Sequence, residues 1–499
     1  MEFIRGVDRE QIILFPESVE EYIDDNSVAR VIDAYINSLD LEALGFSRTQ
    51  TKETGRPPYD PKDILRLYVY GYMNRIRSSR RLEAESKRNL EVLWLLRKLR
   101  PDHKTIANFR RENPKALKQV FVAFVKLCVK LGLYGKELAG IDGSKFKAVN
   151  SKGRNFTGEK LKKLIKRIEE HIECYLKELE TTDEVEDKVE KEKSAQEIGE
   201  IIKGLKERKE LYDGYSKELE KNGESQKSLT DSASRLMKAN GKMDVCYNIQ
   251  TAVDSKYKLI AEFEVTNEAN DLNQLTPMAI KTQEILGAEA LEVTADCGYD
   301  SSKDIAMAIQ QGIEVHVAGT DYDICIPASE GEGSEITSHS NGKCVYIKER
   351  NIAVCPMGKV LMPKYYDKNN GRATYYNTHA CKECTCRCTE QKRGHQYKVT
   401  MKVQEYTKEY NDKNLFLRQV HIKPDKDKYA QRKSLCEHPF GTIKRSMDAG
   451  YCLMKGKDKV RGEFSLIFLA YNMKRVINIL GTRKLIESIR KIASTAICT

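Results

Sequence analysis

Three acidic residues stand in sequence contexts that suit metal-dependent chemistry. Asp296 ends an alternating apolar stretch typical of a strand, Asp142 lies in the apolar stretch LAGIDGS, and Glu437 lies in a basic helical segment. Carboxylates gathered from separate elements are costly unless a cation neutralises them. Mg²⁺ takes one or two carboxylates and also binds phosphate oxygens, and two such ions can hold the attacking and leaving oxygens of a phosphoryl displacement. The three acids therefore favour phosphoryl chemistry, provided that the fold brings them together.

Asp296 also has a simpler interpretation. An Asp followed closely by a glycine, here Gly298, is ordinary turn chemistry, so this acid can be a turn cap and nothing more. Ligands of open α/β sheets, in contrast, bind at the carboxyl ends of strands, which is where Asp296 stands. Only other acids placed beside Asp296 would separate the two interpretations.

The elements that must position these acids are those of a mixed α/β sheet. Periodicity predicts three strands in sequence, a helix, a strand, a helix and a fifth strand. The predicted elements are strands 138–148, 245–253 and 259–266, helix 275–286, strand 291–295, helix 304–311 and strand 313–318. Such an order is typical of antiparallel strands followed by parallel ones. Asp142 and Asp296 then belong to the first and fourth strands.

Length and composition restrict the class of protein. A chain of 499 residues favours two to four structural units. Its mean hydropathy is -0.58, no signal peptide is evident, and the longest apolar run, Leu466–Tyr471, is too short to cross a bilayer. We therefore predict a cytoplasmic, nucleoid-associated protein with no membrane partner. The 14 cysteines then indicate free thiols or metal ligands, and the net charge of +11 indicates a polyanion partner.

The N-terminal part carries a concentrated basic segment. Between Arg75 and Arg111 there are twelve Lys or Arg residues and four acids, on short helical patterns separated by a tight turn. This arrangement resembles a helix-turn-helix unit, in which Lys104, Asn108 and Arg111 share one helical face and are candidate DNA contacts. The alternative is a solvated basic face on a helical domain.

Two insertions are predicted around the sheet. Apolar residues spaced by three and four from Leu161 onward, followed by a second helical pattern, predict an antiparallel helical hairpin. Further on lies a cysteine-dense β-rich segment in which four cysteines have spacing compatible with zinc. These candidate ligands are Cys355, Cys381, Cys384 and Cys388. The alternative, unligated thiols around a core of tyrosines, stays open.

Several motifs in order along nearly the whole chain carry a family resemblance. They are the basic segment at 59–111, IDGSKFKA, SASRLM, YNIQTAVD, VTNEANDLNQLTPM, ADCGYDS, EHPFGTIKR and the tail LAYNMKRVINILG. With these motifs the chain resembles the bacterial insertion-sequence transposases of the DDE class, in the group of insertion sequence eleven-eighty-two. The resemblance implies an RNase H-like catalytic core with a mixed sheet and helical and β-rich insertions, preceded by an all-α N-terminal DNA-binding domain.

The resemblance also implies a catalytic site. Asp142, Asp296 and Glu437 would be the catalytic triad and would bind Mg²⁺, with Mn²⁺ as a substitute; Zn²⁺ in the cysteine segment stays open. Lys444 stands seven residues after Glu437, as the signature of the third acid requires, and would contact phosphate. Arg432, Lys433 and Tyr429 match that signature loosely; Arg432 and Lys433 are also candidate DNA contacts.

The implied domain organisation follows the motifs. The expected units are an N-terminal helical domain at 1–135, a catalytic core at 136–155 and 228–320, a helical hairpin at 156–227, a β-rich insertion at 321–424 and a C-terminal part at 425–499 with the catalytic helix.

The function predicted from the sequence is DNA transposition. A transposase would bind the terminal inverted repeats of its element, cleave DNA with a divalent metal ion and transfer the strand to target DNA. Its partners would be double-stranded DNA and further copies of itself, as a homodimer or larger. Two alternatives remain: a transposase-derived DNA-binding regulator without catalysis, and a nuclease that makes no strand transfer. A cleavage assay with Mg²⁺ on end-bearing DNA would separate the regulator from the two enzymes, and joined products would separate the transposase from the nuclease. Paired inverted repeats in the DNA flanking the gene would identify the substrate.

Overall fold

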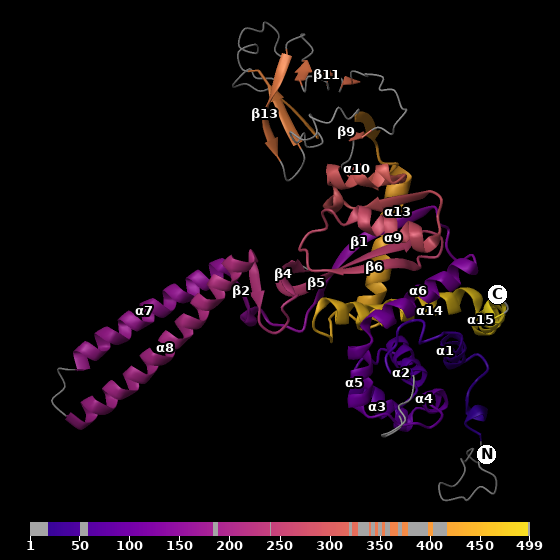
Figure 1. The fold of residues 1–499 in the computed structure, drawn as a ribbon, viewed down its shortest axis with the longest axis horizontal. Helices are drawn as coiled ribbons and strands as arrows, with labels where there is room; N and C mark the ends of the chain where they lie inside the picture. Colours follow the sequence, from indigo (N-terminus) through magenta and orange to yellow (C-terminus); the bar gives the residue numbers. More distant parts are fainter. Residues whose placement is uncertain are drawn as a thin grey trace, which may run out of the picture.

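A six-stranded mixed sheet lies at the centre of the computed structural model (Figure 1). Its strands are β1 (Leu138–Lys147), β4 (Arg235–Ala239), β5 (Lys242–Asp254), β6 (Ile260–Thr266), β7 (Leu291–Ala295) and β8 (Ile313–Val317). The order is β4-β5-β1-β7-β8, and β6 also pairs with β5. β5 runs antiparallel to β1, β4 and β6, whereas β1, β7 and β8 are mutually parallel. The predicted mixed sheet is therefore confirmed.

The structure describes most of the chain. The described residues are 18–49, 58–182, 188–239, 241–318, 322–327, 339–340, 345–347, 352–354, 360–367, 372–377, 398–402 and 417–497. The four candidate zinc ligands fall outside these residues, so the zinc prediction stays a prediction. They are Cys355, Cys381, Cys384 and Cys388.

The two faces of the sheet have different covers. The connections between strands supply α9 (Leu275–Leu286) and α10 (Ser302–Gln310), which pack with Ile141 and Val293 in one apolar core. Leu138 points to the opposite face and packs against α13 (Lys426–Gly441). Because side chains alternate along a strand, Gly140 and Asp142 share the face of Leu138. A Cβ on Gly140 would lie 2.9 Å from the Cβ of Leu435, so glycine lets α13 approach the strand closely.

The N-terminal part consists of helices that join the core of the sheet. They are η1 (Val19–Tyr22), α1 (Val28–Asn37), α2 (Pro61–Met73), α3 (Ser79–Arg88), α4 (Leu90–Leu95), α5 (His103–Glu112) and α6 (Pro114–Lys130). The chain ends in α14 (Lys457–Leu480) and α15 (Thr482–Ile497), and α14 lies between these helices and the sheet (Figure 1). Phe263 of β6 contacts both Phe121 of α6 and Phe468 of α14, with ring centroids 5.3 and 4.7 Å apart. One continuous apolar core thus runs from the N-terminal helices to β5 and β6.

Two insertions extend away from the sheet (Figure 1). The first is the helical hairpin of α7 (Gly158–Thr182) and α8 (Lys188–Asn222), which projects as an arm from a small base of η2 (Lys152–Arg154), β2 (Asn155–Thr157) and β3 (Gln226–Ser228). The second lies at the opposite end of the sheet from the N-terminal helices and contains short strands. They are β9 (Tyr322–Pro327), β10 (His339–Ser340), β11 (Val345–Ile347), β12 (Ile352–Val354), β13 (Val360–Asp367), β14 (Arg372–Tyr376), β15 (Lys398–Lys402) and β16 (Leu417–Ile422).

Two short elements complete the description near the sheet. They are the 3-10 turn η3 (Cys297–Tyr299) after β7 and the π-helical turn η5 (Thr442–Ser446) after α13. Among the helices that the structure describes, none has both the length and the apolar character needed to cross a membrane.

Candidate active site

Asp142 and Asp296 lie side by side on neighbouring parallel strands. The pairing of β1 with β7 ends at Gly140 opposite Thr294, and each acid follows two residues further along its strand. Both acids therefore share the sheet face that α13 covers. Each carboxylate is held by a backbone N–H group: Asp142 Oδ1 accepts from Gly143 at 2.8 Å, and Asp296 Oδ1 accepts from Gly298 at 2.8 Å. Asp296 caps the turn η3, so its interpretation as a turn cap and its place beside a second acid are both correct.

The charge of this acid pair is not compensated by a paired cation. Among the described residues, neither Asp142 nor Asp296 forms a salt bridge. Burial, and then the neighbouring charge of Asp296, raise the pKa of Asp142 to about 7, with a smaller contribution from Asp271. The N–H of Gly143 and the charge of Arg432 act in the opposite direction without cancelling the effect. A divalent cation would relieve the unfavourable charge that raises the pKa of Asp142 beside a second carboxylate.

The helix α13 brings Glu437 to this region, but a neighbouring side chain occupies the strand surface. Cys436 is fully buried against β1, where its Sγ lies 3.0 Å from the position of a Cβ on Gly140. Burial and the charge of Asp142 raise the pKa of the Cys436 thiol. Glu437 is exposed, and within the described part of the chain it makes no hydrogen bond or salt bridge. The structure thus brings Asp142 and Asp296 together and leaves the Glu437 carboxylate in solvent.

The predicted phosphate contacts on α13 and η5 lie in different surroundings. Burial opposes the charge of Arg432, but Tyr429, Cys436 and the two aspartates together raise its pKa. Lys444 is already engaged: its Nζ donates to Ser144 Oγ at 2.6 Å and to the carbonyl O of Lys145 at 3.1 Å. Lys433 is exposed. Arg432 is therefore the guanidinium whose charge acts on the acid pair, and Lys444 is attached to the same strand as Asp142.

The predicted DNA contacts of the N-terminal part lie on α5. Lys104 and Arg111 are exposed, whereas Asn108 is half-buried and lines a cavity of about 240 Å³. Other cations of the basic segment have structural partners. Arg77 is buried and donates to Glu463 of α14 at 3.0 Å, and Arg110 is buried and donates to the hydroxyl of Tyr72 at 2.7 Å. Only part of the basic segment is thus presented to solvent.

Two family models match separate segments of the chain. A model described as a transposase domain (DUF772) matches residues 17–112, and a model described as a transposase DDE domain matches residues 354–477. The chain is a DDE transposase. Binding and cleaving DNA are the general activities of transposases, and this chain is an enzyme of that class.

Other comparisons add little. No curated protein matches the sequence of this transposase. Among solved structures, a piggyBac transposase in a synaptic complex with hairpin DNA aligns over 93% of this chain and 76% of its own, with 9% identity and a TM-score of 0.29. A TM-score this low carries no argument. The family assignment therefore rests on the two domain matches, of which the second includes Glu437 and Lys444 but neither Asp142 nor Asp296.

A further carboxylate of the transposase lies beside the acid pair and escaped the sequence analysis. Asp271 stands in the loop between β6 and α9, and its Oδ1 accepts hydrogen bonds from Asn248 and Gln250, both at 2.7 Å. Lys145 donates to both of its oxygens, at 3.2 and 3.0 Å. The only sequence signal is the polar stretch NEAND before α9, where a single acid in a loop carries no periodicity.

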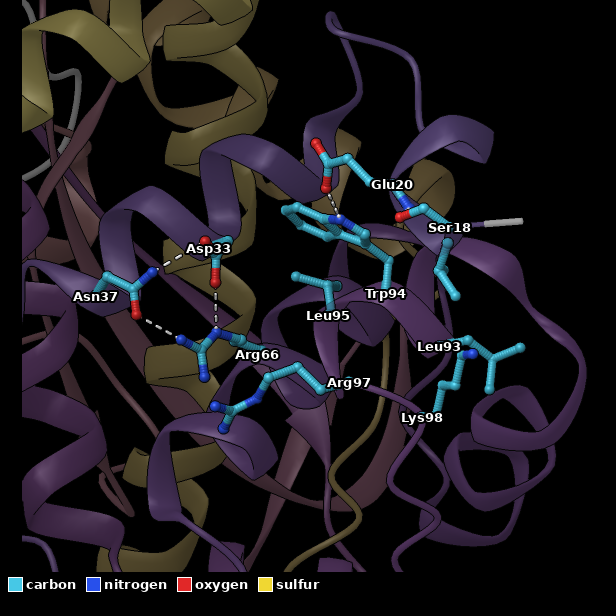
Figure 2. A pocket seen from close by; sticks show the side chains of 11 residues that line it. Ser18, Glu20, Asp33, Asn37, Arg66, Leu93, Trp94, Leu95, Arg97 and Lys98 are labelled. Atoms are coloured by element: carbon cyan, nitrogen blue, oxygen red, sulfur yellow. Dashed lines mark hydrogen bonds and ion pairs between the residues drawn. The ribbon is translucent and has the colours of Figure 1, made fainter. Parts of the chain in front are cut away.

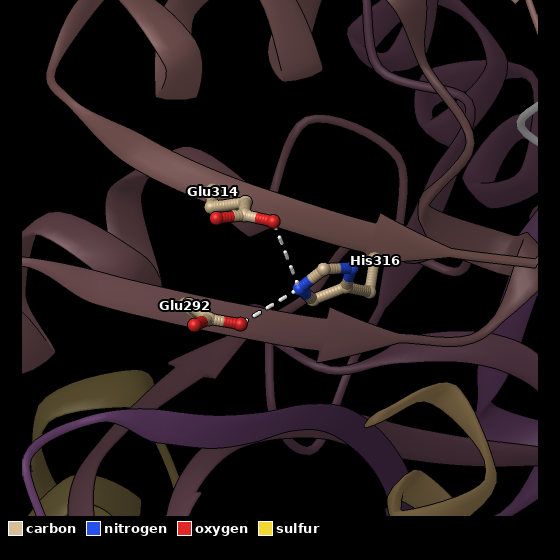
Figure 3. Close-up of side chains that lie close together, drawn as sticks. All are labelled: Glu292, Glu314 and His316. Carbon is tan, nitrogen blue, oxygen red and sulfur yellow. Dashed lines mark hydrogen bonds and ion pairs between the residues drawn. The ribbon is translucent and has the colours of Figure 1, made fainter. Parts of the chain in front are cut away.

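A second group of ionisable residues, on the same sheet, has the composition of a metal site (Figure 3). Glu292 of β7 and Glu314 of β8 converge on His316, which is buried. His316 Nδ1 accepts the backbone N–H of Asp425 at 3.2 Å, so Nε2 carries the hydrogen that it donates to Glu292 at 2.9 Å. A metal ion needs the lone pair of that same nitrogen, and Lys428 already supplies a cation to Glu292 at 2.5 Å. We therefore interpret Glu292, His316 and Lys428 as a structural clamp, a set of hydrogen bonds that holds the start of α13 against β7 and β8.

A cavity of about 660 Å³ among the N-terminal helices is likewise structural (Figure 2). Arg66 in its wall donates to Asp33 at 2.8 Å and to Asp63 at 2.8 Å, and Trp94 donates to Glu20 at 2.5 Å. These charged groups are paired with one another, so we assign no chemistry to the cavity.

Proposed function

We propose that Asp142 and Asp296 hold the divalent metal ions of this transposase, Mg²⁺ or Mn²⁺, and that Glu437 completes the set when DNA is bound. One observation carries the proposal: two half-buried aspartates meet at adjacent strands, and among the described residues neither has a paired cation, whereas carboxylates withdrawn from water are ordinarily paired. Oxygen donors of this kind are the ligands that Mg²⁺ and Mn²⁺ prefer. When bound, the ions would stabilise charge on the attacking and leaving oxygens of a phosphodiester.

The remaining residues of the site would orient the DNA. Arg432 lies where its charge acts on both aspartates, so it would neutralise a phosphate brought to them. Lys444 would be a second phosphate contact. Its hydrogen bond to Ser144 of β1 would hold it at a fixed distance from Asp142. Lys433, exposed on the same helix, would bind the backbone further out.

The topology supports an RNase H-like catalytic core. Three antiparallel strands, β1, β5 and β6, precede the parallel strands β7 and β8, and the spatial order is β6-β5-β1-β7-β8. In this proposal the core comprises 136–155 and 228–320, completed by the C-terminal part at 425–499 with α13. The hairpin at 156–227 and the β-rich unit at 321–424 are insertions that carry no part of the acid pair.

The N-terminal unit at 1–135 would recognise the terminal inverted repeats. Lys104 and Arg111 are exposed on α5, and further cations of the neighbouring helix α3 and its flanks are also exposed. Those cations include Arg75, Arg80 and Arg81. Point variants test this role better than a truncation, because removal of these helices would expose the core they share with α14. The Lys104→Ala and Arg111→Ala variants should each lower affinity for end DNA and reduce the salt dependence by about one phosphate contact.

The central experiment is a cleavage and joining assay on DNA that carries the sequences flanking the gene, with Mg²⁺. The wild type should release a 3′ end and join it to target DNA, while Asp142→Asn and Asp296→Asn should bind the same DNA without cleaving it. Cleavage without joined products would indicate a nuclease, and binding without cleavage by the wild type would indicate a regulator. Full cleavage by either variant would refute the proposed site. Sedimentation of the protein with end DNA would show whether two or more copies assemble.

A further inference from the structure

We propose that Asp271 is a further metal ligand of this transposase, so that the site is built on three aspartates as well as Glu437. The inference rests on the proposed function and adds a residue from a loop that neither domain match includes. It is carried by the geometry around two glycines, by the hydrogen bonds of Asp271 and by an unpartnered buried oxygen beside it.

The first observation is that Asp271 lies close to the turn capped by Asp296 and to the strand position that follows Asp142, and its charge acts on Asp142. A Cβ on Gly143, the residue after Asp142, would lie 2.4 Å from Asp271 Oδ1. A Cβ on Gly298 would lie 3.8 Å from Asp271 Oδ2 and 2.9 Å from Asp296 Oδ1. Carboxylate oxygens of Asp271 and Asp296 thus approach one point in space, the position that a Cβ on Gly298 would occupy. Any larger residue at position 143 would collide with the carboxylate.

The second observation is that the two oxygens of Asp271 differ. Oδ1 accepts from Asn248, Gln250 and Lys145, which occupies its lone pairs and fixes its orientation. Within the described part of the chain, Oδ2 accepts only from Lys145, and it is the oxygen nearer to Gly298. Metal-ligating carboxylates are characteristically held by hydrogen bonds of this kind, with one oxygen fixed and the other presented to the ion.

The hydrogen bonds continue to the turn that Asp296 caps. Gln250, which donates to Asp271, accepts in turn from the hydroxyl of Tyr299, a fully buried residue of η3. Asp271 and Asp296 are therefore positioned through one connected network, so that a shift of either carboxylate is transmitted to the other.

The third observation is an oxygen without a partner. Asn248 is fully buried, yet its Oδ1 accepts no hydrogen bond from the residues that the structure describes. It lies 2.9 Å from the position of a Cβ on Gly143, in the same space that Asp271 Oδ1 borders. A buried amide oxygen without a partner costs about 1–3 kcal/mol, and a metal-bound water in that space would satisfy it.

The ion pair with Lys145 explains how the negative charge of Asp271 is tolerated beside Asp142 and Asp296. Its ammonium compensates one negative charge, which leaves Asp142 and Asp296 as the uncompensated pair. The competing account is that Asp271 and Lys145 are merely a structural ion pair. The two accounts make different predictions for Lys145→Met. If Asp271 is a metal ligand, Asn248 and Gln250 still hold its carboxylate in place and the site survives. If Asp271 and Lys145 are only a structural ion pair, losing Lys145 does the same damage as losing Asp271.

The test is the binding of Mn²⁺ to the full-length protein without DNA, followed by electron paramagnetic resonance and by calorimetric titration. Asp271→Asn should weaken Mn²⁺ binding by at least about tenfold, and Lys145→Met should leave it close to the wild type. Asp142→Asn is the reference for the proposed function. Melting temperatures of all variants report folding, and the double variant Asp271→Asn with Lys145→Met removes both charges, so that no unpaired ion disrupts the fold.

Each outcome decides between the accounts. Weak Mn²⁺ binding in Asp142→Asn, in Asp271→Asn and in the folded double variant, with normal binding in Lys145→Met, supports the ligand role. Weak binding in Asp142→Asn alone overturns the role of Asp271 and leaves the proposed function standing. Equal weakening in Asp271→Asn and Lys145→Met shows a structural pair and also overturns it. Normal binding in Asp142→Asn removes the proposed metal site itself, and this inference with it.

Discussion

Two groups of acids stand on the same sheet face and share the strand β7, yet the protein treats their charges in opposite ways. Glu292 receives hydrogen bonds from Lys428 and His316, which outweigh its burial and lower its pKa. Asp296, four residues later, stands beside Asp142, whose pKa burial and that neighbour raise to about 7. Three potential metal ligands within reach of one another therefore do not by themselves indicate a metal site. Our proposal rests instead on an acid pair that has no compensating cation among the described residues.

Different parts of the helix α13 serve the two groups of acids. Near its start, α13 presents Lys428 to Glu292 and its backbone N–H of Asp425 to His316, which fastens it to β7 and β8. One turn after Lys428, Arg432 faces the acid pair instead. The clamp at the start of the helix therefore sets the position of the residues that follow it.

The largest effect is expected at the acid pair. Asp142→Asn and Asp296→Asn should each lower the DNA cleavage rate by at least about 10³-fold, because metal ions contribute several kcal/mol of charge stabilisation in the transition state. The melting temperature should stay the same or rise at neutral pH, since each change removes one of two repelling charges. A large loss of stability in either variant would contradict the view that this pair is uncompensated.

At the clamp, we expect a loss of stability without a loss of metal binding. Glu292→Gln should lower the free energy of unfolding by about 1–2 kcal/mol, because Lys428 and His316 lose their charged acceptor. Mn²⁺ affinity should not change. Glu314→Gln is the matched control, because Glu314 is 65% exposed and its contact with His316 is long, at 3.6 Å. Chemical denaturation measures the first effect, and loss of Mn²⁺ binding in Glu292→Gln would show that the clamp holds a metal after all.

Smaller effects are expected from substituting two cations of α13, Lys428 and Arg432. Lys428→Met should cost up to about 1 kcal/mol of stability, as expected for a largely solvent-screened pair, with little change in the cleavage rate per folded molecule. Arg432→Met should leave stability nearly unchanged and weaken binding of end DNA, measured by titration at several salt concentrations. Equal effects of the two substitutions on DNA binding would remove the distinction between clamp and site.

The smallest effects are those of pH on stability, and their signs should differ. The pKa of Glu292 is lowered on folding, so its stabilisation is present above its ordinary value of 4.5 and is lost as the pH falls below it. The pKa of Asp142 is raised from 3.8 to about 7, so the folded protein loses stability as the pH rises between these values. The difference in melting temperature between wild type and Glu292→Gln should therefore shrink toward acid. That between wild type and Asp142→Asn should grow from pH 4 to pH 7.

Local patterns sufficed for much of the fold. The helix Leu275–Leu286 and the strand Leu291–Ala295 have the predicted ends, because their apolar periodicity and flanking glycines are local signals. Asp60 followed by Pro61 is a local signal for a helix start, and Asp60 caps α2 by accepting the N–H of Lys62 at 2.8 Å. The strands carrying Asp142 and Asp296 were predicted from the same kind of pattern, and their order along the chain predicted a mixed sheet.

Charge compensation, in contrast, was decided by the tertiary structure. Lys428 meets Glu292 across 136 positions of sequence, and Lys145 meets Asp271 across 126. Such pairs leave no periodic pattern, so the sequence alone could not show which acids are neutralised. Nor could it show that Cys436 faces β1 while Glu437 stays in solvent. The sequence by itself determined which carboxylates end buried strands. The packing of α13 and of the loop before α9 decided which of them remain uncompensated, because a pKa depends on neighbours in space and not on neighbours in the chain.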